Sequence, residues 1–306
     1  MLREAFYWIL NMSIIATVYG MLLYILRYIK ALPRTVIYAL WGVVLLRMLC
    51  PVSFSSQLSL MNILSRLFDR TLVRTVPVEH LDLTVSNTIQ GALTYQPFTY
   101  KSDIYEKFFT VASVIWFLLA LVGLLTILLM YGWTMTEMKK ATLLRDNIYE
   151  GSMVTSPTIV GILRPRIILP LNIEEKKLEY ILLHEKIHEL RQDNLWRILA
   201  ILAACIHWFN PLSWVFLKLF LNDCELACDE GVVKRLKPEE RKEYARALVT
   251  YADADRMIFS SSFGNNKVKS RVLQVLSYRR LTWFSTFCFS ILAIGVAVLL
   301  LTNGVT

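Results

Sequence analysis

Charged side chains are scarce in this chain of 306 residues. Asp, Glu, Lys and Arg make up 19% of the sequence, whereas hydrophobic residues make up 56%. This composition is too apolar for an ordinary soluble enzyme and favours a membrane protein. Cysteine is absent from residues 54–106, so that segment cannot contain an internal disulfide.

A compact basic domain is also lacking, although the net charge is +9. The basic residues instead cluster beside long apolar segments. We therefore expect anionic membrane lipid as the partner of this charge, and no direct contact with nucleic acid.

Long apolar stretches predict four membrane-spanning helices. Residues 5–26, 108–131 and 281–302 contain no charged side chain, and each exceeds the roughly 20 residues that cross a hydrocarbon core of about 30 Å. Residues 36–51 form a shorter candidate that contains Arg47, whose side chain we expect to extend to the membrane interface.

The basic residues between the first two spans set the predicted orientation. Arg27, Lys30 and Arg34 lie in this short connection, which the positive-inside rule places in the cytoplasm. The sequence thus predicts a multi-pass protein of the bacterial cell membrane with its N-terminus outside. The expected parts are spans one and two (1–53), an extracellular loop (54–106), span three (107–131), a cytosolic domain (132–280), and span four with a short external tail (281–306).

Histidine is rare, yet two of the four histidines stand one helical turn apart in the run His184-Glu185-Lys186-Ile187-His188. Residues four apart share a helix face, so both imidazoles can bind one Zn²⁺ ion. Glu185 can then accept a proton from a water activated by the metal, which is the chemistry of peptide-bond hydrolysis. The alternative is an amphipathic helix with two ordinary histidines.

A third ligand is expected downstream, where Glu225 and Asp229 share a face of another predicted helix. Glu225 can complete the zinc site, while Asp229 can accept a hydrogen bond from the rear nitrogen of a ligating histidine. Cys224 and Cys228 are the weaker alternative, because a catalytic site needs only one further ligand.

The fold class expected is a mainly α membrane protein with four transmembrane helices and a cytosolic α+β zinc metallopeptidase domain between helices three and four. Residues 158–163 and 166–170 predict two short strands around a turn. Their exposed edge is either a site for adding an extended substrate strand or part of a structural hairpin. Residues 195–221 are broken at Asn210-Pro211 into two helices, which we expect to lie at the membrane interface.

The chain resembles the BlaR/MecR-type antirepressors, which are membrane-embedded zinc metallopeptidases of the gluzincin type. The matching stretches are residues 45–51, 161–170, 184–193, 207–214 and 225–229. The resemblance implies that His184, His188 and Glu225 bind the metal and that Glu185 is the general base.

The resemblance also implies a signalling role, in which the protease cleaves a winged-helix transcriptional repressor, itself, or both. We expect self-cleavage in the flexible stretch 260–266, at the bond between Ser262 and Phe263. Family members that sense β-lactams carry a C-terminal penicillin-binding domain, and the serine-x-x-lysine and lysine-threonine-glycine motifs of such domains do not occur in this chain. The chain is therefore either part of a longer sensor, or its external loop or a partner receives the signal.

Two other functional classes remain open at this point. One is a membrane quality-control or processing protease of the HtpX or CaaX kind, which pairs the same histidine motif with a later glutamate and aspartate. The other is a non-enzymatic membrane receptor with a structural zinc site. The oligomeric state, including a homodimer, is also open.

Overall fold

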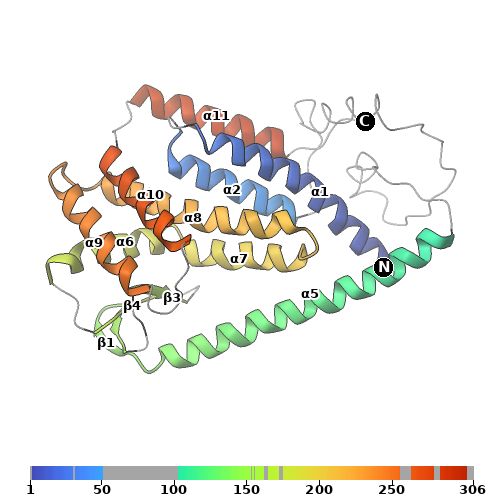
Figure 1. The fold of residues 1–306 in the computed structure, drawn as a ribbon, viewed down its shortest axis with the longest axis horizontal. Coiled ribbons are helices and arrows are strands. Elements are labelled where there is room, and N and C mark those ends of the chain that lie inside the picture. Colours follow the sequence, from blue (N-terminus) through green and yellow to red (C-terminus); the bar gives the residue numbers. More distant parts are fainter. Residues whose placement is uncertain are drawn as a thin grey trace.

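The computed structural model describes residues 2–29, 32–50, 103–152, 154, 156–161, 165–171, 175–255, 263–278 and 283–301. The described chain is mostly helical, with one small sheet (Figure 1). The helices are α1 (Leu2–Leu26), α2 (Arg34–Leu49), α5 (Asp103–Met138), α6 (Glu175–Leu190), α7 (Asp193–Ile206), α8 (Pro211–Val233), α9 (Glu240–Asp255), α10 (Phe263–Ser277) and α11 (Trp283–Leu301). The strands are β1 (Thr142–Arg145), β2 (Ile148–Glu150), β3 (Thr158–Val160) and β4 (Arg166–Leu169).

The largest apolar core lies among α1, α2, α7 and α8. Tyr19, Trp41 and Phe220 are almost fully buried there. Helix α11 packs against α2, and α5 runs along α1 and α7 at the side of the bundle (Figure 1). The Trp116 indole of α5 donates to the Ile206 carbonyl at 2.8 Å, which ties α5 to the end of α7.

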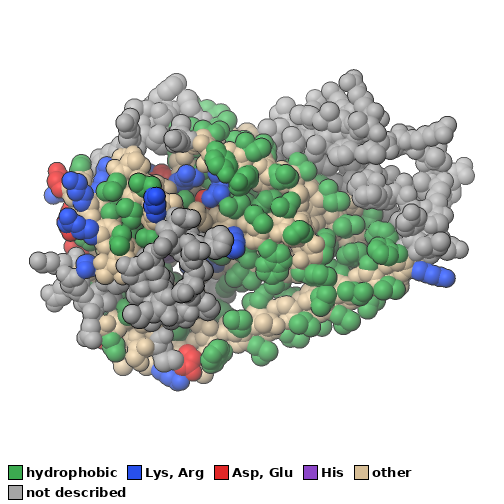
Figure 2. Space-filling view, viewed as in Figure 1, with side chains coloured by type: hydrophobic (Ala, Val, Ile, Leu, Met, Phe, Trp, Pro, Cys, Tyr) green, Lys and Arg blue, Asp and Glu red, His purple; other side chains and the backbone are tan. Residues whose placement is uncertain are grey.

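Two helices in the described residues are long and apolar enough to cross a membrane, namely α1 and the segment Lys107–Met138 of α5. Much of α5 exposes large apolar side chains, among them Phe108 and Leu128. Figure 2 shows hydrophobic surface over much of the described face, with charged side chains gathered mostly at the end near α9 and α10. Helix α2 has 16 residues and α11 has 19, so the other two spans stay predictions.

The predicted break at Asn210-Pro211 is confirmed as the junction between α7 and α8. Asn210 caps α8 by accepting from the Leu212 backbone N–H at 3.0 Å, and Pro211 stands at the first helical position. The Asn210 amide also donates to Ser13 and Thr17 of α1 at 2.9 and 2.8 Å. The α7–α8 hairpin therefore lies alongside α1 and α2. Its expected position at the membrane interface stays a prediction.

His207, for which the sequence suggested no role, connects the α7–α8 hairpin to α2. Its Nε2 atom lies 2.9 Å from the Met48 carbonyl oxygen at the end of α2, and its side chain is fully buried. A carbonyl in the last turn of a helix has no partner within the helix. His207 supplies a donor to it and joins the tip of the hairpin to α2.

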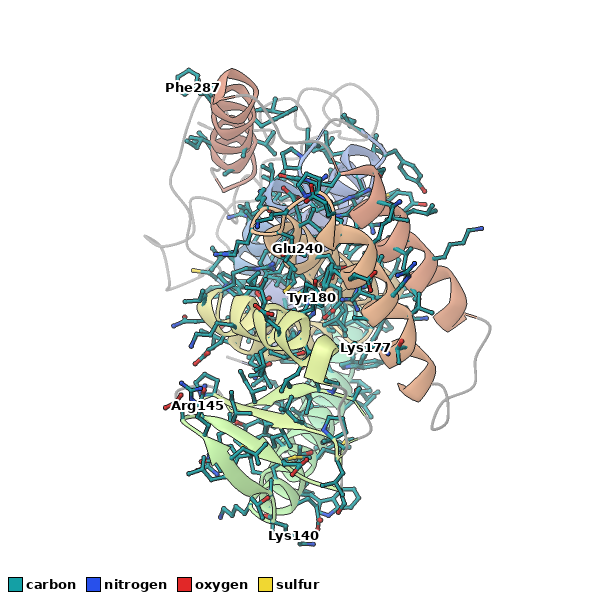
Figure 3. All side chains as sticks on the ribbon, turned by 90° about the vertical axis from the view of Figure 1, so that its left-hand side faces the viewer. Lys140, Arg145, Lys177, Tyr180, Glu240 and Phe287 are labelled. Carbon is teal, nitrogen blue, oxygen red and sulfur yellow. The ribbon has the colours of Figure 1, made fainter. Side chains whose placement is uncertain are left out.

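The sheet has the order β1-β2-β4-β3 and lies beneath α6 in the view from the α9 and α10 end (Figure 3). Strands β3 and β4 pair antiparallel, which confirms the predicted hairpin, whereas β2 and β4 pair parallel. Strands β1 and β2 were not predicted. The backbone carbonyl groups of Ile159, in β3, and of Gly161, just after it, both accept hydrogen bonds from the Asn194 side chain at 3.0 Å. A substrate strand added at this edge would have to replace these two bonds.

A second core joins α6, α8, α9 and α10. Ile187, Val232 and Tyr244 are buried in it. Helix α8 therefore contributes to both cores, with Phe216 and Phe220 in the first and Cys228, Val232 and Val233 in the second. Glu225, which is expected to complete the metal site, lies between these two apolar segments.

Gly20 permits the close approach of α1 to α8, because a Cβ atom at this position would overlap the Phe216 ring. We expect Gly20→Ala to destabilise the fold by about 1–3 kcal/mol, as overpacking of a core does. Thermal unfolding of the purified protein in detergent measures this effect.

Gly132→Ala is the matched control, because no atom of the described residues lies within 4 Å of the position that a Cβ atom would take at Gly132 in α5. It should be neutral or slightly stabilising. Equal unfolding temperatures for the two variants would show that α1 and α8 do not pack as described.

Candidate metal centre

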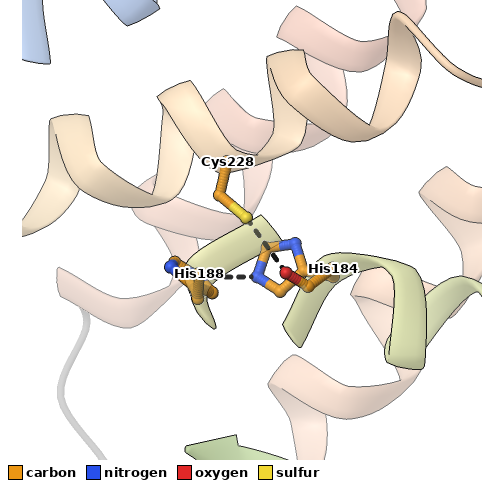
Figure 4. A group of neighbouring side chains, drawn as sticks. All are labelled: His184, His188 and Cys228. Carbon is orange, nitrogen blue, oxygen red and sulfur yellow. Dashed lines mark hydrogen bonds between the residues drawn. The ribbon is translucent and has the colours of Figure 1, made fainter. Parts of the chain in front are cut away.

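His184 and His188 face each other on α6, one turn apart (Figure 4). Their Nε2 atoms are 3.0 Å apart, and the two rings meet nearly at right angles. Both side chains are buried. The helical spacing thus directs two nitrogen ligands to one point, as the sequence predicted for a metal site.

Glu225 of α8 reaches the same point from the other side. Its Oε2 atom lies 3.6 Å from His184 Nε2, and its Oε1 atom lies 3.6 Å from His188 Nε2. Bonds of about 2.0–2.1 Å around a tetrahedral zinc ion place the ligand atoms roughly 3.3 Å apart. The observed spacings lie on either side of this value, so the three side chains fit a bound divalent cation.

Cys228 is the competing third ligand (Figure 4). Its Sγ atom groups with one ring nitrogen each of His184 and His188, all within 4.8 Å of one another. The thiol donates to the His184 backbone carbonyl at 3.3 Å, so it already has a partner within the protein. Because Glu225 lies within 3.6 Å of both Nε2 atoms, its geometry fits the metal better.

Asp229 supports His184 mainly through the Tyr244 hydroxyl, which lies between them. The sequence did not indicate this role of Tyr244. The Tyr244 hydroxyl donates to Asp229 Oδ1 at 2.6 Å and lies 2.9 Å from His184 Nδ1. The direct distance from His184 Nδ1 to Asp229 Oδ1 is 3.4 Å. Since the Tyr244 proton points to Asp229, its oxygen can accept the Nδ1 proton, which leaves Nε2 of His184 free to bind a metal.

Asp193 performs this task for His188. Its Oδ2 atom lies 2.6 Å from His188 Nδ1, and its side chain is fully buried. Gln192 adopts a left-handed conformation (φ 54°) between α6 and α7, and this tight turn brings Asp193 back beside His188. A carboxylate five residues beyond the second histidine was the only signal of this role in the sequence.

Two arginines that the sequence did not single out balance the carboxylates. Arg197 contacts Glu225 Oε1 at 2.6 Å, and Arg271 contacts Glu225 Oε2 at 3.3 Å. Arg271 also donates to both oxygens of Asp229, at 2.7 and 2.8 Å.

The electrostatics of the centre favour a cation between the histidines. Burial raises the pKa of Glu225, but the positive charges of His188 and Arg271 outweigh it and hold this pKa well below the usual range. Burial opposes protonation of His184 and His188, yet interactions with Cys228 first, and then with neighbouring tyrosine and carboxylate groups, raise the pKa of both imidazoles well above the usual value. A site that attracts protons in this way also attracts a metal ion, which competes for the same lone pairs.

Glu185 is buried on α6 beside His184. Within the described part of the chain its carboxylate takes part in no hydrogen bond or ion pair, so it is not committed to another group. Of the expected self-cleavage bond, Ser262 lies outside the described residues, and Phe263 is the first residue of α10.

A family model described as BlaR1 peptidase M56 matches residues 7–275, which include the histidine site and most of α1 together with all of α2, α7 and α8. The chain belongs to this family. Membership implies a metallopeptidase, in agreement with the histidine pair and its carboxylate neighbours.

Named relatives support this assignment over part of the chain. The regulatory protein BlaR1 of Bacillus licheniformis is 29% identical over 138 residues, which cover 42% of this chain and 23% of that protein. The methicillin resistance mecR1 protein of Staphylococcus aureus is 32% identical over 103 residues, which cover 32% of this chain and 18% of that protein. The matched segments thus span about a fifth of the length of these relatives.

Arg271→Ala should be strongly destabilising, because it leaves the fully buried Asp229 carboxylate without its bidentate partner. Breaking a buried ion pair by removing one partner costs about 3–5 kcal/mol. Chemical denaturation followed by tryptophan fluorescence measures the change.

Arg246→Ala makes the same chemical change in an exposed pair, since the side chains of Arg246 and Glu243 are 71% and 55% exposed. It should cost no more than about 0.5 kcal/mol. Similar unfolding midpoints for both variants would contradict the structural role of Arg271.

Proposed function

We propose that this protein is a zinc-dependent endopeptidase whose metal is held by His184, His188 and Glu225. The observation that carries the proposal is the convergence of two Nε2 atoms and one carboxylate at spacings of 3.0–3.6 Å. Three protein ligands leave a fourth position for water, which is typical of catalytic rather than structural zinc.

Each residue of the centre has a distinct task in peptide hydrolysis. The zinc ion, when bound, lowers the pKa of its water to about 7 and polarises the substrate carbonyl. Glu185 acts as the general base that takes the proton from the attacking water and passes it to the leaving amine. Tyr244 and Asp193 hold the two imidazoles in the tautomer that presents Nε2 to the metal.

We further propose a signalling role of the antirepressor type. The relatives are named a regulatory protein and a methicillin resistance protein, and a protease in such a system can act by cleaving a winged-helix repressor, itself, or both. Cleavage at the Ser262–Phe263 bond remains the proposed self-processing step.

The catalytic centre is proposed to face the cytosol. Arg27, at the end of α1, bonds the Asp223 carboxylate, only two residues before Glu225 on α8. The centre therefore lies on the same side as the basic connection between α1 and α2, which the positive-inside rule assigns to the cytoplasm.

Glu185→Gln should abolish hydrolysis while leaving metal binding intact, because it removes the base but none of the proposed ligands. The expected loss is about 100- to 10,000-fold in the rate of peptide cleavage. One readout is the fragment produced by self-cleavage of the purified protein. If the neighbouring gene encodes a winged-helix repressor, cleavage of that repressor is a second readout. Metal-dependent cleavage that persists in the variant would refute Glu185 as the base.

Glu225→Ala and Cys228→Ser distinguish the two candidate third ligands. If Glu225 binds zinc, its loss should weaken zinc affinity at least about 100-fold, whereas Cys228→Ser should change affinity little. Competition with a fluorescent zinc chelator gives both values. The opposite ranking would indicate a thiolate-ligated site and favour a structural role for the metal.

A further inference from the structure

A hydroxyl group on α2 reaches the proposed metal centre through a single carboxylate. The Tyr38 hydroxyl of α2 donates to Asp193 Oδ1 at 2.6 Å. The other oxygen of Asp193 accepts from His188 Nδ1 at 2.6 Å. Tyr38, Asp193 and His188 thus form a continuous hydrogen-bonded chain that ends on a proposed zinc ligand.

The aromatic ring of Tyr38 is held independently of its hydroxyl. One contact is to the Phe220 ring, which stacks on it with centroids 5.6 Å apart and an interplanar angle of 20°. Another is to the Arg191 guanidinium, which lies 4.2 Å from the ring centroid. Removing the hydroxyl alone should therefore leave the packing of α2 intact.

The hydroxyl determines how the buried Asp193 carboxylate is oriented. Arg191 Nη2 lies 3.2 Å from Asp193 Oδ2, the same oxygen that accepts from His188. Only the Tyr38 hydroxyl bonds Oδ1 among the contacts that the described residues make to Asp193. Without this bond the carboxylate can rotate toward Arg191, and the His188 ring loses its fixed acceptor.

The hairpin formed by α1 and α2 also contacts α8, the helix that carries the proposed ligand Glu225. Arg27 bonds both oxygens of Asp223, at 2.9 and 2.6 Å, and the Trp41 indole donates to Asp223 at 2.8 Å. The Thr35 backbone N–H donates to Glu230 Oε2 at 3.1 Å. Asp223 and Glu230 flank the proposed ligand Glu225 along α8. Helices α1 and α2 therefore contact the helix that carries Glu225 and, through Tyr38, the first residue of α7, which supports His188.

We propose that Tyr38 is a positioning residue that couples α2 to the metal centre by holding Asp193, and through it His188, in the metal-binding geometry. This inference rests on the proposed zinc site. It implies that a displacement of α2 changes zinc affinity without any contact between α2 and the metal.

Tyr38→Phe tests the coupling in the full chain purified in detergent, with zinc affinity from chelator competition as the readout. The variant should bind zinc roughly tenfold more weakly, because a hydrogen bond to a buried charged group is lost one step from the ligand. The absorption spectrum of the cobalt-loaded protein should also change, since the spectrum reports the ligand geometry directly.

Tyr19→Phe is the matched control. Tyr19 is fully buried in the same bundle, and its hydroxyl has no hydrogen-bond partner among the described residues. Its zinc affinity and cobalt spectrum should equal those of the parent. An equal loss in both variants would mean that any missing buried hydroxyl disturbs the bundle, and this would overturn the proposal.

The Asp193→Asn variant and the double variant with Tyr38→Phe complete the test. If Tyr38 acts through Asp193, adding Tyr38→Phe to Asp193→Asn should weaken zinc binding little further. Fully additive losses, or unchanged affinity in Tyr38→Phe, would overturn the coupling while leaving the zinc site intact. A parent protein that binds no zinc would overturn the proposed function itself, and the coupling with it.

Discussion

Buried negative charge on α8 is the constraint on which the structure depends. Asp223, Asp229 and Glu230 are buried there, and Glu225 is about one-third exposed. Such charges are tolerated only when cations and hydrogen-bond donors reach them. Arginines from distant parts of the chain reach three of these carboxylates: Arg27 pairs with Asp223, and Arg271 pairs with Asp229 and Glu225. Glu230 pairs with Lys234, which lies one turn further along at the end of α8. The need to pair the buried carboxylates of α8 therefore determines how α1, α2 and α10 are placed around it.

The same constraint produces a centre suited to a cation. Each histidine has its own carboxylate beside Nδ1: Asp193 bonds His188 directly, and Asp229 reaches His184 through Tyr244. Glu225 lies near the Nε2 atoms of both rings. Arg197 and Arg271 each contact one oxygen of Glu225, and Arg271 Nη2 also lies 3.5 Å from His184 Nε2. The Glu225 carboxylate is thus already oriented before a metal binds. Pre-orientation of ligands reduces the entropy lost on binding and so favours a tight, geometrically defined site.

Local patterns made part of this structure predictable from sequence. The His184–His188 spacing and the Glu225–Asp229 spacing each need only one helix, and the capping chemistry of Asn210-Pro211 is local as well. Tyr244 and Arg271 could not be predicted, because they reach His184 and Asp229 across 60 and 42 residues. The packing of the α7–α8 hairpin against α1 and α2 was not predicted, because an apolar sequence indicates apolar surroundings without distinguishing lipid from neighbouring helices.

The proposed metal centre lies close to α1 and α2, and this closeness limits how a signal of the proposed kind can reach it. The sequence predicted a cytosolic domain at residues 132–280 between spans three and four. A flexible attachment of such a domain would absorb small helix movements. The structure instead bonds Arg27, Thr35 and Tyr38 directly to residues that flank or support the ligands. Packed, hydrogen-bonded contacts transmit displacements rather than absorb them, since close-packed interiors have little room to yield. A shift of α2 by a fraction of a hydrogen-bond length is therefore enough to disturb Asp193, and a signal need not unfold or undock the catalytic part to change its activity.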